Sequence, residues 1–190
     1  MSPTVTSASR TLRNVVVTSL AATTSIAGDV DATWKGLLAG GESGIGALTG
    51  GFVEEFDLPV RIGGTLKVSP DEGLSRVEIR RMSFVERLAL TLARTVWKNA
   101  GSPEVEHERL GVVIGTGLGG GESLIDAVDK LRAGGYRKVS PFAVQMVMPN
   151  GPSATVGLEL GARAGGHHAG VGVLVRLRGN RPRVPDDRAR

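Results

Sequence analysis

The sequence predicts an α/β fold, because segments typical of strands alternate with segments typical of amphipathic helices through about residue 165. The composition suits that class. Of the 190 residues, 41% are hydrophobic, only 4% are aromatic and 28 are glycines, so a core has to be built from aliphatic side chains and tight glycine turns. This length fits one domain, or a large part of a fold with two halves.

The first elements expected are a strand and a helix. Val15–Leu20 is rich in β-branched side chains and predicts a strand. Asp29 is of a type that caps helices, and the helix that it would begin runs to about Ala39, before two glycines. Its apolar face is made of Trp34, Leu37 and Leu38. Pro59–Leu66 has no helical period and is expected to be extended.

The strongest helix signal follows residue 82. Ser83 and Glu86 have the spacing of a capping box, in which each side chain accepts a hydrogen bond from the other residue's backbone. Apolar residues recur at helical spacing at Val85, Leu88, Leu92 and Val96. Gly101-Ser102-Pro103 is expected to end this helix, since glycine and proline both favour termination.

A strand, a glycine-rich loop and another helix come next. Leu110–Ile114 predicts a short buried strand, Gly115–Gly121 forms the loop, and Glu122–Ala133 predicts the helix. The side chains expected to face inward from this helix are Leu124, Ile125, Val128 and Leu131.

The last periodic segment begins after an apolar stretch, Ser140–Met148, that Pro141 interrupts. Pro152 suits the first turn of a further helix, where its missing N–H costs nothing. Within that helix one face is almost bare, being formed by Ala154, Gly157 and Gly161. We expect this face to pack very closely against a neighbouring element.

Both ends of the chain differ from the periodic middle. Residues 1–13 are rich in Ser and Thr and are predicted to be disordered, and residues 14–166 form the predicted domain. Residues 167–190 are rich in Arg and Pro, lack periodicity and are predicted to be a non-native tail. That tail carries six arginines against Asp186 and Asp187, which accounts for the whole net charge of +4. A nucleic-acid surface is therefore not indicated, because it needs basic residues spread over a folded face.

No membrane span is predicted, since no apolar run approaches about 18 residues. Arg10 and Arg13 precede Val15–Ala22 in the order of a secretory signal, but the intervening Ser and Thr residues make a poor apolar region. We expect a cytoplasmic protein. The chain has no cysteine, which excludes a disulfide framework, a zinc–thiolate site and a cysteine nucleophile within it.

The motifs alone do not disclose an enzyme. Gly115, Gly117 and Gly120 match the G-x-G-x-x-G pattern of dinucleotide sites, but residues 134–138, about twenty positions on, supply no acid for the ribose. A tight strand-to-helix turn explains the loop as well. His167-His168 has no third ligand at a plausible spacing for a metal, and His107 lies in a polar stretch expected to be a solvated loop. We expect neither a cofactor nor a metal.

Nine ordered stretches between residues 14 and 165 carry a family resemblance. They are Val15–Thr18, Thr33–Lys35, Gly41–Ile45, Phe52–Gly64, Asn99–Val105, Gly115–Gly119, Val139–Met146, Met148–Gly151 and Gly161–Gly165. In them the chain resembles the elongating β-ketoacyl-acyl-carrier-protein synthases, most closely those of mycolic-acid synthesis in actinobacteria. It departs from the family at Ser19, where glycine is usual, and at Pro152-Ser153, where alanines are usual.

The resemblance implies a thiolase-like fold, of which this chain would hold only the N-terminal portion of the αβαβα layers. It also implies a homodimer that uses acyl carrier protein, an acyl-cysteine intermediate and two histidines that assist decarboxylation of malonyl-carrier. By resemblance, the acyl channel or the dimer contact would involve Gly115, Thr116, Gly117, Met146, Met148, Pro149 and Asn150. Since the nucleophile and both histidines are missing, no residue of this chain is expected to be catalytic.

A lost reading frame explains the missing cysteine. In the family, Gly161–Gly165 is followed within about ten residues by the nucleophile, whereas here the chain continues Gly166-His167-His168. One GC-rich back-translation of residues 165–177, with codons chosen to fit the family motif, becomes Gly-Val-Ile-Thr-Pro-Val-Ser-Ala-Cys-Ser-Ser-Gly when one G is deleted from the codons of Gly165 and Gly166. Out-of-frame GC-rich DNA also favours the Arg, Gly and Pro of the tail. We therefore expect a frameshift after about Gly166.

Three hypotheses follow from the sequence. The first is an N-terminal fragment of a 3-oxoacyl-carrier-protein synthase, inactive as written, which would expose an apolar face to aggregation. The second is a noncatalytic module that pairs with a full-length synthase through Ser140–Asn150. The third, a nucleotide-binding α/β domain, would use the glycine loop.

Overall fold

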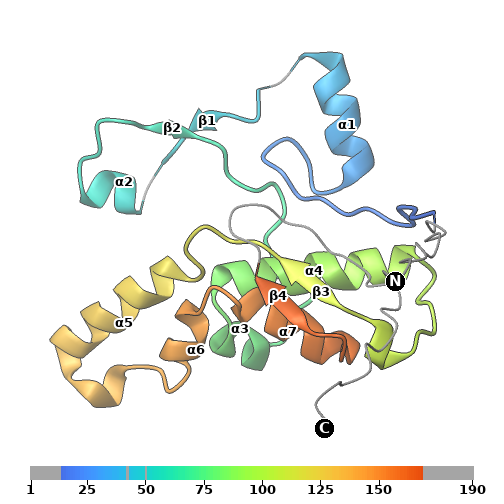
Figure 1. Ribbon diagram of the computed structural model, residues 1–190. Helices are drawn as coiled ribbons and strands as arrows, with labels where there is room; N and C mark the ends of the chain where they lie inside the picture. Colours follow the sequence, from blue (N-terminus) through green and yellow to red (C-terminus); the bar gives the residue numbers. More distant parts are fainter. Residues whose placement is uncertain (1–13, 42, 50, 169–190) are drawn as a thin grey trace, which may run out of the picture.

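The packed interior of the protein lies between helix α4 (Phe84–Asn99), helix α7 (Gly151–Leu160) and strand β3 (Val112–Ile114). This computed structural model describes residues 14–41, 43–49 and 51–168 (Figure 1). The remaining helical segments are α1 (Val30–Ala39), α2 (Phe52–Glu55), α3 (Arg76–Arg81), α5 (Gly121–Gly134), α6 (Ala143–Val147) and the 3₁₀ turns η1 (His107–Arg109) and η2 (Tyr136–Lys138). The remaining strands are β1 (Gly46–Ala47), β2 (Ile62–Gly63) and β4 (Gly166–His168).

Two separate strand pairs lie in the described residues. β1 pairs antiparallel with β2, in the part of the molecule that carries α1 and α2 in Figure 1. β3 pairs parallel with β4, with Val112 opposite Gly166 and Ile114 opposite His168. Parallel strands need a crossover, which α5, α6 and α7 provide here. β4 thus extends through two residues that the sequence assigned to the tail.

The core is small and aliphatic. Val112, Ile114 and Val156 are almost fully buried, and the side chains packed around them are Ala89, Ala93, Leu160 and Ala162. Because alternate residues of a strand face opposite sides, α4 and α7 cover the face of β3 that carries Val112 and Ile114. Val113, on the other face, is only half-buried. Burial in the described residues is therefore concentrated on one face of the β3–β4 pair.

Local signals placed most helix ends correctly. Asp29 caps α1 by accepting a hydrogen bond from the Ala32 N–H at 2.8 Å, and Gly40 ends it with φ of +61°. Ser83 and Glu86 form the predicted capping box of α4. Gly101 adopts φ of +82° after α4, and Pro152 lies in the first turn of α7.

The strand predicted at Val15–Leu20 is absent: residues 15–20 are assigned to neither a strand nor a helix. Val15 is 93% exposed. A β-branched segment becomes a strand only when another strand supplies hydrogen-bond partners, and β3 and β4 pair with each other instead. The prediction was wrong because pairing is not encoded in the segment itself.

The apolar face of α1 is exposed, and two predictions about buried faces were wrong in part. Trp34, Leu37 and Leu38 on α1 are exposed. On α5 the same holds for Leu124, Ile125 and Leu131, while Val128 is half-buried. On α7, Ala154 is exposed and Gly157 has open space beside it, while the buried residues are Gly151, Pro152, Ser153 and Val156. The close packing predicted for this face holds only at Gly161, where a Cβ would lie 2.7 Å from the His107 Nδ1. These helices have the predicted period, but within the described residues most of these faces are left exposed.

Candidate functional site

The two segments singled out by the sequence lie against each other. The glycine loop (residues 115–121) links β3 to α5, and the 146–151 turn links α6 to α7. The Thr116 hydroxyl lies 3.5 Å from the Pro149 carbonyl oxygen and accepts a hydrogen bond from the Gly119 N–H at 3.2 Å. Thr116 therefore connects the fold of the loop to the position of the turn.

Close packing explains two of the loop's glycines, Gly119 and Gly120. A Cβ on Gly119 would lie 2.6 Å from the Val147 carbonyl oxygen, and Gly119 has φ of +69°. A Cβ on Gly120 would clash with the Met146 carbonyl oxygen and lie 2.7 Å from the Ser83 Cβ. Backbone from two loops meets here with no room for side chains.

The seven predicted residues differ in exposure. Gly115 is buried, Thr116 and Met146 are half-buried, and the exposed members are Gly117, Met148, Pro149 and Asn150. Beside them Leu118, which the sequence analysis did not single out, is 75% exposed. The glycine loop and the 146–151 turn together thus present a partly apolar edge to solvent, the kind of surface that an acyl chain or a second polypeptide can cover.

This geometry disfavours a dinucleotide at the glycine loop. A pyrophosphate would need the free backbone N–H groups at the start of α5. The Met146, Val147 and Met148 carbonyl oxygens lie against Gly119 and Gly120 at that place. Carbonyl oxygens carry partial negative charge and would repel a phosphate, so the tight-turn interpretation of the loop fits better.

The first turn of α4 supports both segments. Glu86 is 1% exposed, and its Oε2 accepts hydrogen bonds from the Ser83 N–H at 2.7 Å and the Ser83 hydroxyl at 2.9 Å. Its Oε1 lies 2.7 Å from where a Cβ on Gly151 would be. From the first turn of α5, Glu122 accepts a hydrogen bond from the Phe84 N–H at 3.0 Å. Sequence spacing identified Glu86 as a cap, but not its contact with the turn.

An ion-pair cluster fixes α4 between α3 and α7. Arg94 donates to Glu78 on α3 at 2.8 Å and to Glu159 on α7 at 2.6 Å. Hydrogen bonds from the Ser75 hydroxyl and backbone, together with Arg94, lower the pKa of Glu78 to about 2. The two carboxylates raise the pKa of the Arg94 guanidinium further above its already high value. The cluster joins three helices, α3, α4 and α7, and contains none of the seven predicted site residues.

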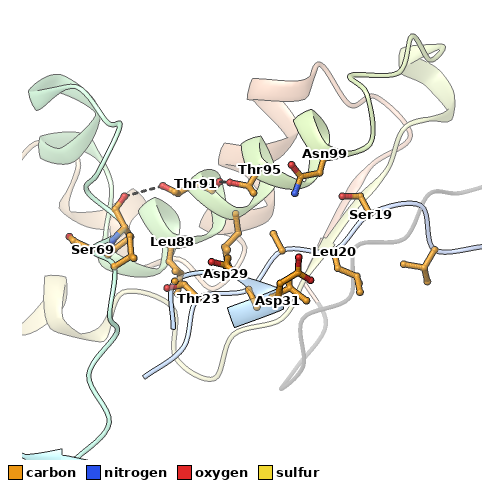
Figure 2. A pocket seen from close by; sticks show the side chains of 18 of the residues that line it. Ser19, Leu20, Thr23, Asp29, Asp31, Ser69, Leu88, Thr91, Thr95 and Asn99 are labelled. Carbon is orange, nitrogen blue, oxygen red and sulfur yellow. Dashed lines mark hydrogen bonds between the residues drawn. The ribbon is translucent and has the colours of Figure 1, made fainter. Parts of the chain in front are cut away.

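A larger cleft lies on the other side of α4 (Figure 2). It has a volume of about 710 Å³ and is lined by residues 17–23, 28–31 and 68–70 and by one face of α4. Leu88 and Leu92, two of the apolar residues at helical spacing on α4, line this cleft. The hydroxyls of Ser19 and Thr23 are buried there without a hydrogen-bond partner in the described residues. The seven predicted site residues are not among those that line it, so cleft and candidate site are distinct.

The histidines gather into no site in the described structure. His107 is exposed on η1, where its carbonyl oxygen accepts a hydrogen bond from the Arg163 N–H at 2.8 Å. His167 and His168 lie on β4. Among the described residues, no cluster of three or more histidine, aspartate or glutamate side chains is arranged to hold a metal ion. In those same residues no helix is long and apolar enough to cross a membrane.

Comparison with known protein families gives a match over most of the chain. A family profile described as "Beta-ketoacyl synthase, N-terminal domain" matches residues 12–169. The chain is 53% identical over 161 residues to the 3-oxoacyl-[acyl-carrier-protein] synthase 2 of Mycobacterium leprae (strain TN), which covers 85% of this chain and 36% of that protein. It is 34% identical over 154 residues to the synthase of the same name from Staphylococcus aureus (strain COL), with 80% and 36% covered. The chain therefore spans little more than a third of the length of these relatives.

Solved structures show the same fold. The ishigamide ketosynthase/chain length factor matches with a TM-score of 0.65 at 21% identity, covering 82% of this chain and 39% of that chain. A beta-ketoacyl synthase from Burkholderia phymatum STM815 matches with a TM-score of 0.59 at 18% identity, covering 82% and 38%. A type II polyketide ketosynthase solved in complex with its acyl-carrier protein gives 0.56 at 17% identity, covering 77% and 39%. The described residues form part of this thiolase-like α/β fold.

Proposed function

This chain belongs to the β-ketoacyl synthase family, and from that membership we propose that it is the amino-terminal portion of a 3-oxoacyl-[acyl-carrier-protein] synthase. Such a synthase extends an acyl chain by Claisen condensation with malonyl units on acyl carrier protein. The proposal is carried by the family match to residues 12–169, a range that includes the glycine loop, the 146–151 turn and β4.

We propose further that the glycine loop and the 146–151 turn border the acyl channel or the dimer contact of the intact enzyme. The residues assigned to this role are Gly115, Thr116, Gly117, Met146, Met148, Pro149 and Asn150. Their direct contact through Thr116 and Pro149, and the exposed apolar side chains of Leu118 and Met148 beside it, support this role.

In this proposal the chain as written is inactive, because its reading frame is lost after Gly166. The condensing reaction needs a cysteine thiolate, and the 190 residues contain no cysteine. The family match ends at residue 169, three positions after the expected break. An intact continuation would follow β4 directly, so the nucleophile would lie close to the glycine loop that precedes α5.

Sequencing the gene across the codons of Gly165 and Gly166 tests this account. Removal of one G should open a frame that encodes Cys-Ser-Ser-Gly and later histidines. The chain expressed from that frame should take up iodoacetamide at the new cysteine and condense an acyl chain with malonyl-carrier, whereas the chain as written should do neither. A shifted frame without Cys-Ser-Ser-Gly would sink the proposal.

We also propose that the region of α3 and α6 binds an acidic partner, namely acyl carrier protein. Arg76, Arg80 and Arg81 are exposed on α3 and form no ion pair within the described part of the chain. The Arg81 guanidinium lies 5.3 Å from the centre of the Phe142 ring, which brings α3 beside the start of α6. Exposed Arg137-Lys138 precedes that ring by a few residues. Clustered unpaired cations of this kind steer anionic surfaces.

A charge-reversal pair tests the carrier contact. Arg80→Glu with Arg81→Glu should weaken carrier binding by at least about tenfold at low salt, and the difference should shrink at high salt. Lys35→Glu, on α1 far from this region in Figure 1, is the matched control and should leave binding unchanged. Equal affinities for the double variant and the control would remove this partner assignment.

A noncatalytic role is the second candidate, favoured by the exposure of Met148, Pro149 and Asn150 at the surface. In it the chain pairs with a full-length synthase through Ser140–Asn150. Co-purification of this chain with an intact synthase, abolished by Met148→Glu, would support this second candidate. If the two proteins do not co-purify, the first proposal, an inactive amino-terminal portion of a synthase, stands alone. A cytoplasmic location remains a prediction.

A further inference from the structure

The first turn of α4 contacts both segments of the candidate site. The Ser83 Cβ lies 2.7 Å from where a Cβ on Gly120 of the glycine loop would be. The Glu86 Oε1 lies equally near the corresponding position at Gly151, in the 146–151 turn. Ser83 and Glu86 are 2% and 1% exposed, so solvent does not separate them from either segment.

The two carboxylate oxygens of Glu86 have different tasks. Oε2 accepts two hydrogen bonds from Ser83 and thereby holds the Ser83 side chain toward the glycine loop. Oε1 faces Gly151 and lies 3.5 Å from the Thr155 hydroxyl on α7. Because one rigid carboxylate carries both contacts, displacing the turn disturbs the cap that fixes Ser83.

Glu122 adds a second connection from the loop side. Glu122 directly follows the glycine loop and accepts a hydrogen bond from the Phe84 N–H. This N–H lies at the start of α4, where backbone donors have no partner within the helix. The glycine loop therefore contacts the start of α4 at two places. Gly120 packs against Ser83, and Glu122 accepts the hydrogen bond from Phe84.

We infer that Glu86 is a positioning residue that fixes the spacing between the glycine loop and the 146–151 turn, so that the two segments move together. The inference rests on the proposed function only in taking these segments as the border of the acyl site. The coupling itself follows from contacts in this chain and needs no catalysis.

Hydrogen exchange at two amides tests the coupling in the 190-residue chain. The Gly119 N–H, bonded to Thr116 Oγ1, reports on the loop, and the Gly151 N–H, bonded to the Met148 carbonyl oxygen, reports on the turn. Glu86→Leu removes both contacts at similar volume and should speed exchange at both amides by at least about tenfold. Glu86→Gln keeps one acceptor for Ser83 and should restore most of the protection. The Val112 N–H, bonded to Gly165 across the β3–β4 pair, should not change.

The chain contains a matched control, since Ser75 and Glu78 form a capping box of the same kind on α3 without contact to either segment. Because Glu78 also pairs with Arg94, the control variant is Ser75→Ala, which should leave exchange at Gly119 and Gly151 unaffected. A purely structural role for Glu86 would instead speed exchange at Val112 as much as at the two reporters, and that result, or a response at only one reporter, overturns the inference. If Glu86→Leu does not fold, Glu122→Ala, which removes the acceptor of the Phe84 N–H at an exposed residue, should speed exchange at both reporters, and no response at Gly151 would overturn the inference equally. Since no activity is measured, an error in the reading-frame proposal leaves this test untouched.

Discussion

Arg94 Nε donates to the Glu159 carboxylate at 2.6 Å and so ties the middle of α4 to the end of α7. The same guanidinium binds Glu78, which anchors α3. These side chains are about one-third exposed, so the pairs are partly screened by water. We predict that Arg94→Leu lowers the free energy of unfolding by about 1–2 kcal/mol in urea denaturation. Lys130→Met, which breaks an exposed pair with Asp126 on α5, should cost under about 0.5 kcal/mol.

Acid should weaken the protein through Glu78. Its pKa in the fold is about 2, below its ordinary value of 4.5, so its stabilising contribution is complete above about pH 4.5 and is lost as the pH falls toward 2. Unfolding measured from pH 6 to pH 2.5 should show the difference between the wild type and Glu78→Gln shrinking across this window. Ser75→Ala removes the largest cause of the lowered pKa and should move the loss to higher pH. A difference that stays constant with pH would contradict this assignment.

Gly151 and Gly157 should respond in opposite directions to the same substitution. In Gly151→Ala the new Cβ meets the buried Glu86 carboxylate at 2.7 Å, and we expect a cost of about 1–3 kcal/mol. In Gly157→Ala, on the same helix, no neighbouring atom lies within 4 Å, and the better helix former should stabilise by up to about 1 kcal/mol. Urea midpoints of the two variants measure both effects. Equal midpoints would mean that α7 does not sit on Glu86 as described.

The glycine loop offers a second matched pair. Gly119→Ala forces a side chain onto a residue with φ of +69° and against the Val147 carbonyl oxygen, and should cost about 1–3 kcal/mol. Gly117→Ala, two residues earlier, meets open space and should change stability by less than about 0.5 kcal/mol. Thermal unfolding of both variants checks this. A tolerated Gly119→Ala would show that the loop and the turn are not packed together.

Sequence signals worked where the physical cause is local. A helix cap depends on residues three positions apart, so Asp29 and the Ser83–Glu86 pair could be identified without knowing the fold. The same Ser-x-x-Glu spacing at Ser75 and Glu78 marks α3, which the sequence analysis overlooked. The family resemblance named Thr116 and Pro149 together as candidate site residues, but the contact between them was not predicted, because no local pattern joins residues 33 positions apart.

Sequence signals failed where the cause is distant. The hydrophobic period of α5 is real, yet Ile125 on it is 65% exposed, because a period gives the apolar face and not the element that covers it. The strand expected at Val15–Leu20 failed for the same reason, since strand formation requires a partner from elsewhere. The curated relatives are nearly three times as long as the matched segment.

The pairing of β3 with β4 consists of main-chain hydrogen bonds, such as that from the Val112 N–H to the Gly165 carbonyl oxygen. Main-chain hydrogen bonds of this kind do not depend on which side chains follow Gly165. A change of codons there can therefore remove a reactive side chain while the β3–β4 pairing is kept. An antibody against α4 and α7 would therefore recognise chains with and without the nucleophile alike. Under the proposed function, a count of thiols in the purified protein distinguishes the two chains where recognition of their shared fold does not.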